Sequence, residues 1–387
     1  MSGTDITNLL DIVQRKINAV DSSASTSDLL YLLSAIRQSG EGSVFAYDNE
    51  SQIPNLLDGT PDPEMIAYTL DSDKLYFQRG SWVGKAIPII PFQGSNFGYA
   101  SGGTAGSIPP SNVIDKFPFA ADFTGTATDV GDLIVGTRDV AGQSSSSHGY
   151  HTGGRVVPTV SDVIAKFSFT TDGDATDAGD LSVARYMNAG QSSIENGFGY
   201  TSGGSPTTYH IEKFPFAADF TGTATDVGDL TVGRYYCAGQ SSTTHGYSSG
   251  GYTNPTTNIN VIDKFSFTTD GDATDVGDIS IARKWSTGQS STTHGYSSGG
   301  YTTGPLPVDI IEKFPFASDD DGTDVGDLTE GKRWNSGQSS TTHGYSSGGY
   351  FSDVMDVIEK FPFASDDNAT DAGDLSVARY APAGQQY

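Results

Sequence analysis

The chain has 387 residues, and 21 Lys and Arg against 47 Asp and Glu give a formal net charge of −26 at pH 7. Such a charge disfavours binding to a nucleic-acid backbone or an anionic membrane, because like charges repel one another before contact. Cys237 is the only cysteine, which excludes an intramolecular disulfide and a thiolate metal cluster, and we expect it to fill a small buried space. We find no secretory signal pattern and no run near the ~20 apolar residues of a membrane span, so a soluble chain is expected.

The first predicted elements are two short helices within residues 1–42. TDITNLLDIVQRKINAV places apolar residues at spacings of four, three, four and three, namely Ile6, Leu10, Val13, Ile17 and Val20. This is a two-heptad seam, which needs a partner helix, and Thr4 supplies an N-cap. A second helix is expected in SDLLYLLSAIRQSG, ending at Gly40. Because such short helices are marginal alone, we expect an oligomerisation or attachment segment, with a homotrimer preferred. The alternative is an intramolecular helix pair.

A small β-meander is expected within residues 43–90. MIAYTL and KLYFQ alternate apolar and polar residues and meet at Asp71, Ser72 and Asp73, after which Arg79 and Gly80 turn into SWVGK. Alternation with a period of two, interrupted by turn residues, is typical of antiparallel strands.

Residues 91–387 contain six repeats at a spacing of 47 to 51 residues. A GG pair, a Lys-Phe pair and a GD(L/I) motif followed by an Arg and a Gln recur in each. The second glycines of the GG pairs are Gly103, Gly154, Gly204, Gly251, Gly300 and Gly349. From the motif's Asp to the Gln is eleven positions in all six copies, but the Arg is shifted by one in the first and fifth, at Arg138 and Arg333. A register kept through a local shift indicates strand pairing with a β-bulge at the shifted Arg.

Each repeat contains four strand candidates: AGQSS innermost, then HGYSSGG, VIEKFPF and DLSVAR, with a hairpin loop such as TTDGDATDVG between the last two. Four short strands repeated six times predict a propeller of six four-stranded blades. Small residues fit near its axis, where six glutamines are expected to form hydrogen bonds: Gln143, Gln191, Gln240, Gln289, Gln338 and Gln385. The slot beside Phe97 in the first blade can be filled by residues 378–387 or by IPIIPFQGSN, and both remain open.

The GG doublet, the hydrophobic-x-x-aromatic strand after it and the Arg before the innermost strand resemble the kelch repeat, over about residues 90 to 387. The family's Tyr is replaced by the Phe after each Lys, and its Trp is absent from all six copies. The resemblance implies a mainly β fold. We therefore expect a six-bladed kelch-like β-propeller (91–387) with a short α-helical N-terminal region (1–42) and a small β module (43–90).

Residues 43–90 also resemble a short module near the N-termini of bacteriophage tail and virion proteins. The order of helices, this module and Ser/Gly/Thr-rich repeats is similar to structural proteins of marine phages. The resemblance implies a non-enzymatic virion protein, a tail fibre or appendage on the tail or particle surface, for host attachment or particle assembly. Its implied partners are further copies of itself, other virion proteins and a host-surface glycan or receptor. The alternatives are a capsid decoration protein, a kelch-like carbohydrate-active enzyme and an interaction scaffold.

No residue set predicts a catalytic group, a metal site or a cofactor. The Asp, Arg and Lys that recur once per repeat are expected to make the same structural contacts in every blade, because an active site is asymmetric. Four histidines share one repeat position and are expected to be packed or hydrogen-bonded: His148, His245, His294 and His343. GYSSG matches a nucleophile elbow by letters, but no helix is expected after it. The acidic stretch Asp270 to Asp278 is expected to be a hairpin turn, with weak Ca²⁺ binding left open.

The candidate contact residues are aromatic side chains on polar loops. They follow the GG pairs or the recurring Arg, and the set is Tyr252, Tyr301, Tyr350, Trp285 and Trp334. Aromatic rings suit both sugar faces and partner proteins. The alternative role for these rings is packing between blades.

Overall fold

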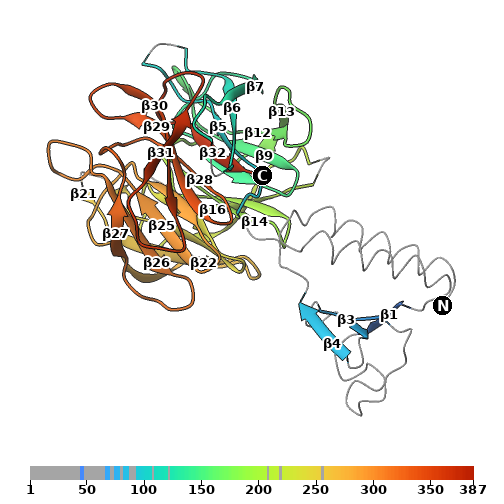
Figure 1. Cartoon of the computed structure of the whole chain (residues 1–387). Coiled ribbons are helices and arrows are strands. Elements are labelled where there is room, and N and C mark those ends of the chain that lie inside the picture. The colour runs from blue at the N-terminus through green and yellow to red at the C-terminus, as the bar shows by residue number, and fades with distance from the viewer. Residues whose placement is uncertain are drawn as a thin grey trace. The chain divides into compact units, whose positions relative to one another are not determined.

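The computed structural model describes residues 44–47, 66–69, 74–78, 82–86, 93–106, 109–120, 123–206, 209–217, 220–253 and 257–387 (Figure 1). The chain divides into two compact units, Met1–Ile90 and Pro91–Tyr387. The helices expected in residues 1–42, with the seam of Ile6, Leu10, Val13, Ile17 and Val20, lie outside the described residues. Within the described ranges, no helix has the length and apolar character required to cross a membrane.

The first unit contains one four-stranded sheet. Its strands, in spatial order, are β1 (Val44–Tyr47), β2 (Ile66–Thr69), β3 (Lys74–Gln78) and β4 (Trp82–Ala86). β2, β3 and β4 pair antiparallel in succession and lie where the sequence indicates a meander. β1 pairs parallel with β2 and is not among the predicted strands.

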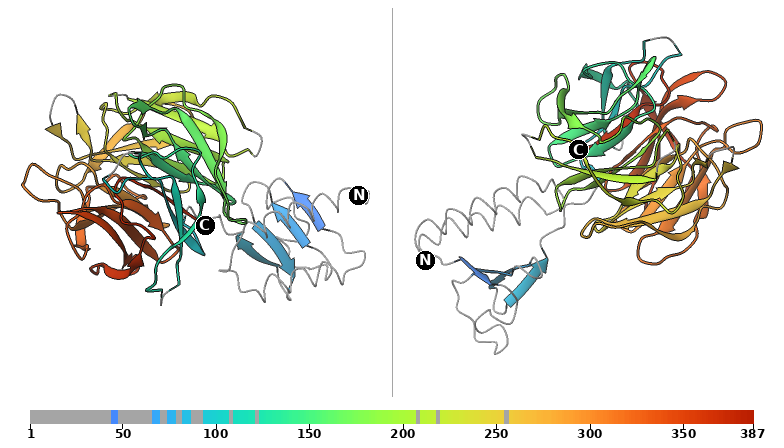
Figure 2. Two further views of the ribbon diagram at one scale, coloured as in Figure 1. Left: turned by 90° about the horizontal axis from the view of Figure 1, so that it is seen from above. Right: turned by 180° about the vertical axis from the view of Figure 1, so that it is seen from behind.

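The second unit is a six-bladed β-propeller, as the repeats predict (Figures 1 and 2). Its blades are antiparallel sheets whose strands follow one another from the axis outward. Blade 1 consists of β32 (Ala383–Gln386), β5 (Phe97–Ser101), β6 (Val113–Pro118) and β7 (Thr128–Asp132). Blade 2 consists of β8 (Ala141–Ser144), β9 (His148–Thr152), β12 (Val163–Ser168) and β13 (Thr176–Asp180). Blade 3 consists of β14 (Ala189–Ser193), β15 (Phe198–Ser202), β16 (His210–Pro215) and β17 (Thr225–Asp229). Blade 4 consists of β18 (Ala238–Ser241), β19 (His245–Ser249), β22 (Val261–Ser266) and β23 (Thr274–Asp278). Blade 5 consists of β24 (Thr287–Ser290), β25 (His294–Ser298), β26 (Ile310–Pro315) and β27 (Thr323–Asp327). Blade 6 consists of β28 (Ser336–Ser339), β29 (His343–Tyr350), β30 (Val354–Pro362) and β31 (Thr370–Asp374).

Two short hairpins connect the second and third strands of blades 2 and 4. They are β10 (Arg155–Val156) with β11 (Thr159–Val160), and β20 (Tyr252–Thr253) with β21 (Thr257–Asn258).

The ring is closed by the C-terminal candidate strand. β32 pairs antiparallel with β5, with Ala383 opposite Ser101. Gly94, from the competing segment before the first GG pair, instead forms an isolated parallel bridge with Ser340 of blade 6. Blade 1 therefore combines strands from both ends of the second unit.

The outermost strand differs from the prediction. It is formed by the Thr-Asp-(Val/Ala)-Gly-Asp segments, such as β7 and β23, which we expected in a hairpin loop, whereas the DLSVAR segments connect one blade to the next. The glycine of each segment has a positive φ, for example +108° at Gly179, and the pairing register shifts beside it. A β-bulge of this kind needs a glycine, so its Gly-Asp pair looks like a turn in the sequence. The connection does not alternate like a strand, because the neighbouring residues Ser182 and Val183 are both exposed between the buried Leu181 and Arg185.

The inner strands approach one another closely around the axis. A Cβ atom on Gly190 would lie 2.3 Å from the carbonyl oxygen of Gly142 in the neighbouring inner strand, so only glycine fits. Gln191 donates from Nε2 to Ser202 Oγ at 2.8 Å in its own blade and to the carbonyl oxygen of Tyr247 at 2.9 Å in the next. All six glutamines are buried and make this bond to the next blade, which confirms the predicted polar core.

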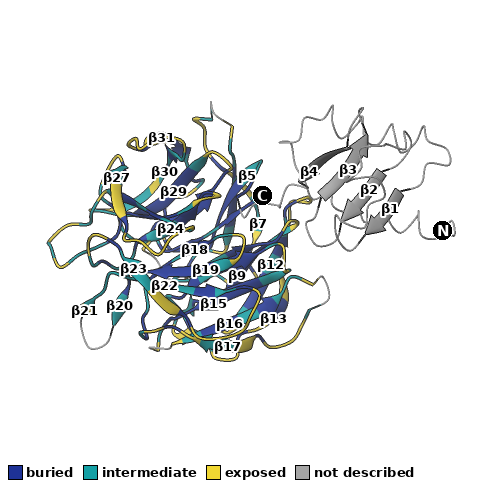
Figure 3. Cartoon of the chain, turned by 90° about the horizontal axis from the view of Figure 1, so that it is seen from below, coloured by how far each residue is buried: buried dark blue, intermediate teal, exposed yellow. Residues whose placement is uncertain are grey.

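Aromatic rings fill the seams between neighbouring blades. Tyr150 of blade 2 packs against Phe214 and Phe216 of blade 3, with ring centroids 5.5 and 4.8 Å apart. The same Tyr-Phe-Phe group recurs in the other five seams. The apolar residues of VIEKFPF therefore lie where blades face each other, and Figure 3 shows the buried strands surrounded by exposed loops.

Candidate functional site

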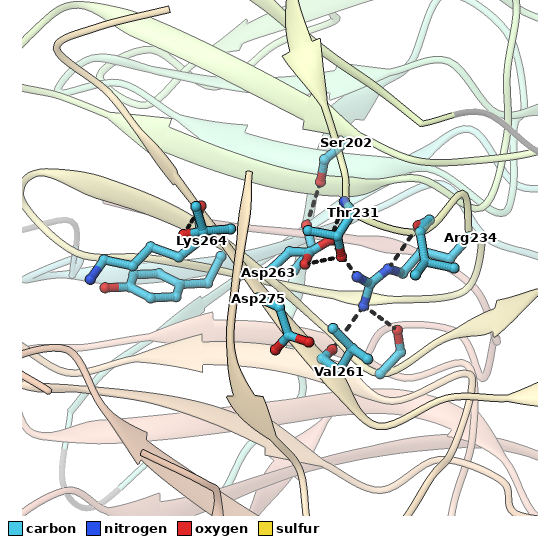
Figure 4. Close-up of polar contacts among 12 residues, drawn as sticks. Ser202, Thr231, Arg234, Val261, Asp263, Lys264 and Asp275 are labelled. Atoms are coloured by element: carbon cyan, nitrogen blue, oxygen red, sulfur yellow. Dashed lines mark hydrogen bonds and ion pairs between the residues drawn. The ribbon is translucent and has the colours of Figure 1, made fainter. Parts of the chain in front are cut away.

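The recurring Arg is buried between blades. Arg234, after β17, forms an ion pair with Asp263 of β22 in the next blade, and both side chains are fully buried (Figure 4). Thr231 donates its N–H and its hydroxyl to the same carboxylate, at 3.0 and 2.6 Å, and the guanidinium donates to the carbonyl oxygen of Val261 at 2.8 Å. Four other seams hold an equivalent pair: Arg185–Glu212, Arg283–Glu312, Lys332–Glu359 and Arg379–Asp115. The recurring Arg is therefore structural.

The acid of this pair precedes the recurring Lys and is not the Asp of the GD(L/I) motif. The motif's Asp instead ends the outermost strand, as Asp229 does in β17. The recurring Lys forms exposed ion pairs with loop acids of the next blade, such as Lys264 with Asp319 at 2.9 Å. The buried base and the recurring Lys thus pair with two different acids, and neither is the motif's Asp.

The shift of Arg138 and Arg333 is not a β-bulge, which corrects the sequence interpretation. The buried position lies five residues after the motif's Asp in every copy, and Thr137 and Lys332 occupy it in the first and fifth. Arg138 and Arg333 occupy the next position, outside the seam, where the second copy has Tyr186. The backbone keeps one register, and only the residue type at the buried position changes.

The four repeated histidines lie at the start of second strands and are hydrogen-bonded. Nδ1 of His148 is 2.8 Å from Ser147 Oγ, and the other three make the same contact with a threonine hydroxyl. Burial, aided by the Lys166 charge, lowers the pKa of His148. Among the described residues, no group of three or more His, Cys, Asp or Glu side chains could hold a metal ion. The middle serines of GYSSG are fully buried in second strands: Ser248, Ser297 and Ser346.

The connections between blades converge at one end of the axis. They form a closed ring of six residues, the axial ring: Asp139, Met187, Tyr236, Trp285, Trp334 and Ala381. Each has a φ between +56° and +63°, a left-handed conformation that is costly for residues other than glycine. The N–H of each donates to the carbonyl of the preceding member, for example Met187 to Asp139 at 2.7 Å, and Asp139 closes the ring by donating to Ala381 at 3.1 Å. This closed ring of bonds holds the six side chains at fixed positions.

The five predicted contact residues lie together at this end of the propeller. Ring contacts of 4.4 to 6.2 Å link eight half-buried side chains into one surface, the aromatic mouth: Tyr235, Tyr236, Tyr252, Trp285, Tyr301, Trp334, Tyr350 and Tyr380. Trp285 and Trp334, the closest pair at 4.4 Å, are neighbours in the axial ring. Five of the rings lie on the connections between blades and three follow the GG pairs within blades, namely Tyr252, Tyr301 and Tyr350. All eight lie outside the Tyr-Phe-Phe groups of the seams.

Two cations lie among these rings and were not predicted. The guanidinium carbon of Arg333 lies 4.5 to 5.3 Å from four ring centroids, those of Trp285, Tyr301, Trp334 and Tyr350. Nζ of Lys284 lies 3.9 Å from the ring centroid of Tyr252 and 4.3 Å from that of Trp285. Burial and the nearby Arg333 lower the pKa of Lys284. Contacts between cations and ring faces are worth about 0.5–1 kcal/mol each at exposed sites, so they help to fix the rings.

The axial ring surrounds a depression of about 80 Å³. Its wall is completed by the residue after each ring member, a set that varies from blade to blade: Val140, Asn188, Cys237, Ser286, Asn335 and Pro382. The second glycine of the GG pair makes room for this set, because a Cβ on Gly251 would lie 3.2 Å from Cβ of Cys237. Cys237 is buried, as predicted. The wall of the depression therefore departs from the sixfold repetition of the blades.

Asp139 is the acid of the axial ring. Burial raises the pKa of its carboxyl, against the lowering effects of Arg138 and Arg155, and Arg138 Nε lies 3.7 Å from its Oδ2. Burial and the Asp139 charge raise the pKa of the Tyr236 phenol, so this phenol stays neutral. A neutral phenol beside a carboxyl paired with arginine suits binding better than proton transfer.

Comparisons of the sequence with protein-family models and with curated proteins give no match. The chain is therefore classified by its fold alone, as a six-bladed β-propeller. Any function must follow from the residues of the mouth and the depression, since a propeller alone does not specify one.

Proposed function

We propose that the propeller is a non-enzymatic recognition domain that binds carbohydrate at the aromatic mouth. The supporting observation is the mouth itself, in which eight half-buried rings form one continuous surface. The C–H faces of a sugar ring pack on aromatic faces, while its hydroxyls remain free for polar groups at the edge. Trp285 and Trp334 supply the largest such faces.

The rigidity of this surface supports the same proposal. The two tryptophans are held by the backbone bonds of the axial ring, Trp334 N–H donating to the Trp285 carbonyl at 3.1 Å, and by the guanidinium of Arg333. A surface ordered before binding loses little conformational entropy when a ligand arrives. This small entropy loss matters most for ligands that bind weakly, such as sugars.

The wider role that we propose is that of a structural protein of a bacteriophage particle. The propeller is displayed on a tail fibre or another appendage, where the mouth contacts host-surface glycan. The support is the resemblance of residues 43–90 to phage N-terminal modules and the kelch-like order of the repeats. Residues 1–42 join the copies of the chain, and decoration of the capsid is the alternative location.

Glycan-array binding of the full chain and of two variants tests the recognition role. Trp285→Ala and Trp334→Ala each remove a central ring and are expected to weaken binding about tenfold to a hundredfold, as for other central aromatic anchors. The matched control is Tyr209→Ala, because Tyr209 is 50% exposed and lies outside the aromatic mouth. Absence of any bound glycan, or equal losses in all three variants, would contradict the proposal.

The oligomeric state tests the attachment role. The intact chain is compared by light scattering with a chain beginning at Gln93, close to the division between the two units. A trimer that becomes a monomer on truncation is expected. Monomers in both cases would contradict the role assigned to residues 1–42.

A further inference from the structure

Three side chains in the wall of the axial depression are buried and have polar atoms without a hydrogen-bond partner. Asn188 is 6% exposed, and neither its Oδ1 nor its Nδ2 is bonded. Asn335 is 7% exposed and donates from Nδ2 to Ser346 Oγ at 2.8 Å, which leaves its Oδ1 unpartnered. Ser286 is 9% exposed, and its Oγ is also unpartnered.

Unpartnered polar atoms of this kind are costly in a folded protein. Each costs about 1–3 kcal/mol when it is buried without a hydrogen bond, and the large majority of buried polar groups have one. The fold does not require them at these positions, since Val140, Cys237 and Pro382 fill the equivalent positions in other blades. We therefore interpret Asn188, Ser286 and Asn335 as a set that faces a ligand.

The composition of the set indicates the chemistry of that ligand. Asn188 offers a donor and an acceptor together, whichever way its amide is oriented, and the complementary partner is another amide. The volume of about 80 Å³ accommodates only a small group, on the order of a few water molecules. Val140 and Met187 add apolar wall beside Asn188, which suits a methyl group.

We propose that the depression binds the acetamido group of an N-acetylated amino sugar whose ring packs on Trp285 and Trp334. Asn188 exchanges two hydrogen bonds with the acetamido N–H and carbonyl, while Ser286 and Asn335 bond neighbouring hydroxyls. This deepens the proposed carbohydrate recognition and depends on it, because the sugar ring must lie on the aromatic mouth.

The test is calorimetric titration of the full chain with N-acetylglucosamine and N-acetylgalactosamine oligosaccharides, and with the same oligosaccharides after de-N-acetylation. The acetylated forms are expected to bind about tenfold more tightly, the value of one or two net hydrogen bonds. Asn188→Ala is expected to lose most of this preference. Its melting temperature is expected to be unchanged or higher, because the variant removes an unpartnered buried amide.

A matched control is Asn196→Ala. Asn196 lies in blade 3 like Asn188, but in the turn between β14 and β15, where its Nδ2 donates to Ser193 Oγ at 2.9 Å. The control is expected to retain the acetyl preference. A preference kept in Asn188→Ala, or a marked loss of stability in that variant, would overturn the inference. Binding that depends on Trp334 but ignores the acetyl group would overturn it as well, while leaving recognition at the mouth intact.

Discussion

Among the residues that the structure describes, five seams of the propeller contain a buried ion pair, and the seam between blades 1 and 2 contains none. There Thr137 replaces the base and Ala165 replaces the acid. His151 of β9 fills the space, with Nε2 2.5 Å from Thr137 Oγ1 and Nδ1 3.1 Å from Ser101 Oγ. Ile134 stands where the other seams have a Ser or Thr whose N–H donates to the acid.

This difference indicates that the acid and the base of a seam are present together or absent together. Either charge alone in a seam would be buried without compensation, which costs several kcal/mol. Both are absent together in the first seam, and the residue that serves the acid is absent with them. The fold thus tolerates the whole pair or a complete neutral replacement, and the single-residue intermediates are the unstable forms.

The largest expected effect is the removal of one charge from a pair. Asp263→Asn leaves the Arg234 guanidinium buried without its counter-ion and is expected to lower the free energy of unfolding by about 3–5 kcal/mol. Urea denaturation at pH 7 measures it. A loss below about 1 kcal/mol would mean that the carbonyl acceptors around Arg234 suffice for its charge.

The next effect is acid destabilisation at the first seam. Burial lowers the pKa of His151 to about 3. The unfolded chain, in which a histidine titrates near 6.5, therefore takes up this proton first, and stability present above pH 6.5 is lost as the pH falls toward 3. At pH 4.5 the loss from this group is about 2–3 kcal/mol. This loss is measured by comparing the pH dependence of the unfolding free energy in the native chain and in His151→Ser. The other histidines with a lowered pKa are present in both chains and cancel in the comparison. Parallel pH profiles would contradict it.

A smaller effect is expected when both charges of a seam are replaced together by neutral residues of the first seam. The triple variant Arg234→Thr, Asp263→Ala, Ser248→His copies Thr137, Ala165 and His151 into the seam between blades 3 and 4 and leaves Thr231 in place. Its stability at pH 7 is expected to lie within about 2 kcal/mol of the native chain, well above that of Asp263→Asn. A triple variant as unstable as the single one would show that the neutral seam works only beside blade 1.

The smallest effect is expected at an exposed pair. Lys264→Gln removes the bridge to Asp319, whose side chain is 58% exposed, and should change the unfolding free energy by less than about 1 kcal/mol. Even this difference is expected to disappear in 1 M salt, because screening weakens exposed ion pairs. Unfolding curves at low and high salt measure it, and a larger loss that persists in salt would place Lys264 among the structural residues.

Much of the propeller could be predicted from the repeats, because the spacing and the recurring residue types identify four-stranded blades and the axial glutamines. The outermost strand was misplaced, since a bulged Gly-Asp pair has the composition of a turn. The shift assigned to Arg333 was also wrong, because residue type and burial give different alignments of this repeat. Residue type matches Arg333 with Arg283, whereas burial matches Lys332 with Arg283. Only the structure distinguishes these two alignments.

The candidate site was predictable only in part. Trp285 and Trp334 could be singled out because aromatic residues on polar loops are conspicuous. Asn188 could not, because a lone Asn after a turn carries no motif, and its meaning depends on the unpartnered state of both amide atoms. The cage of rings around Arg333 likewise depends on two tryptophans from blade connections and two tyrosines that follow GG pairs, which meet at one end of the axis.

The closure of blade 1 has a consequence for biosynthesis. Gln385 bonds Ser101 across 284 positions, and Ala381 completes the axial ring, so neither the inner edge of β5 nor the depression is finished until residues 381–385 leave the ribosome. At about 5–20 residues per second, β5 waits on the order of tens of seconds with an unpaired edge that can recruit another chain. A chain that stops before Ala381 would therefore both expose that edge and lack the depression, so premature termination yields an aggregation-prone product without binding activity.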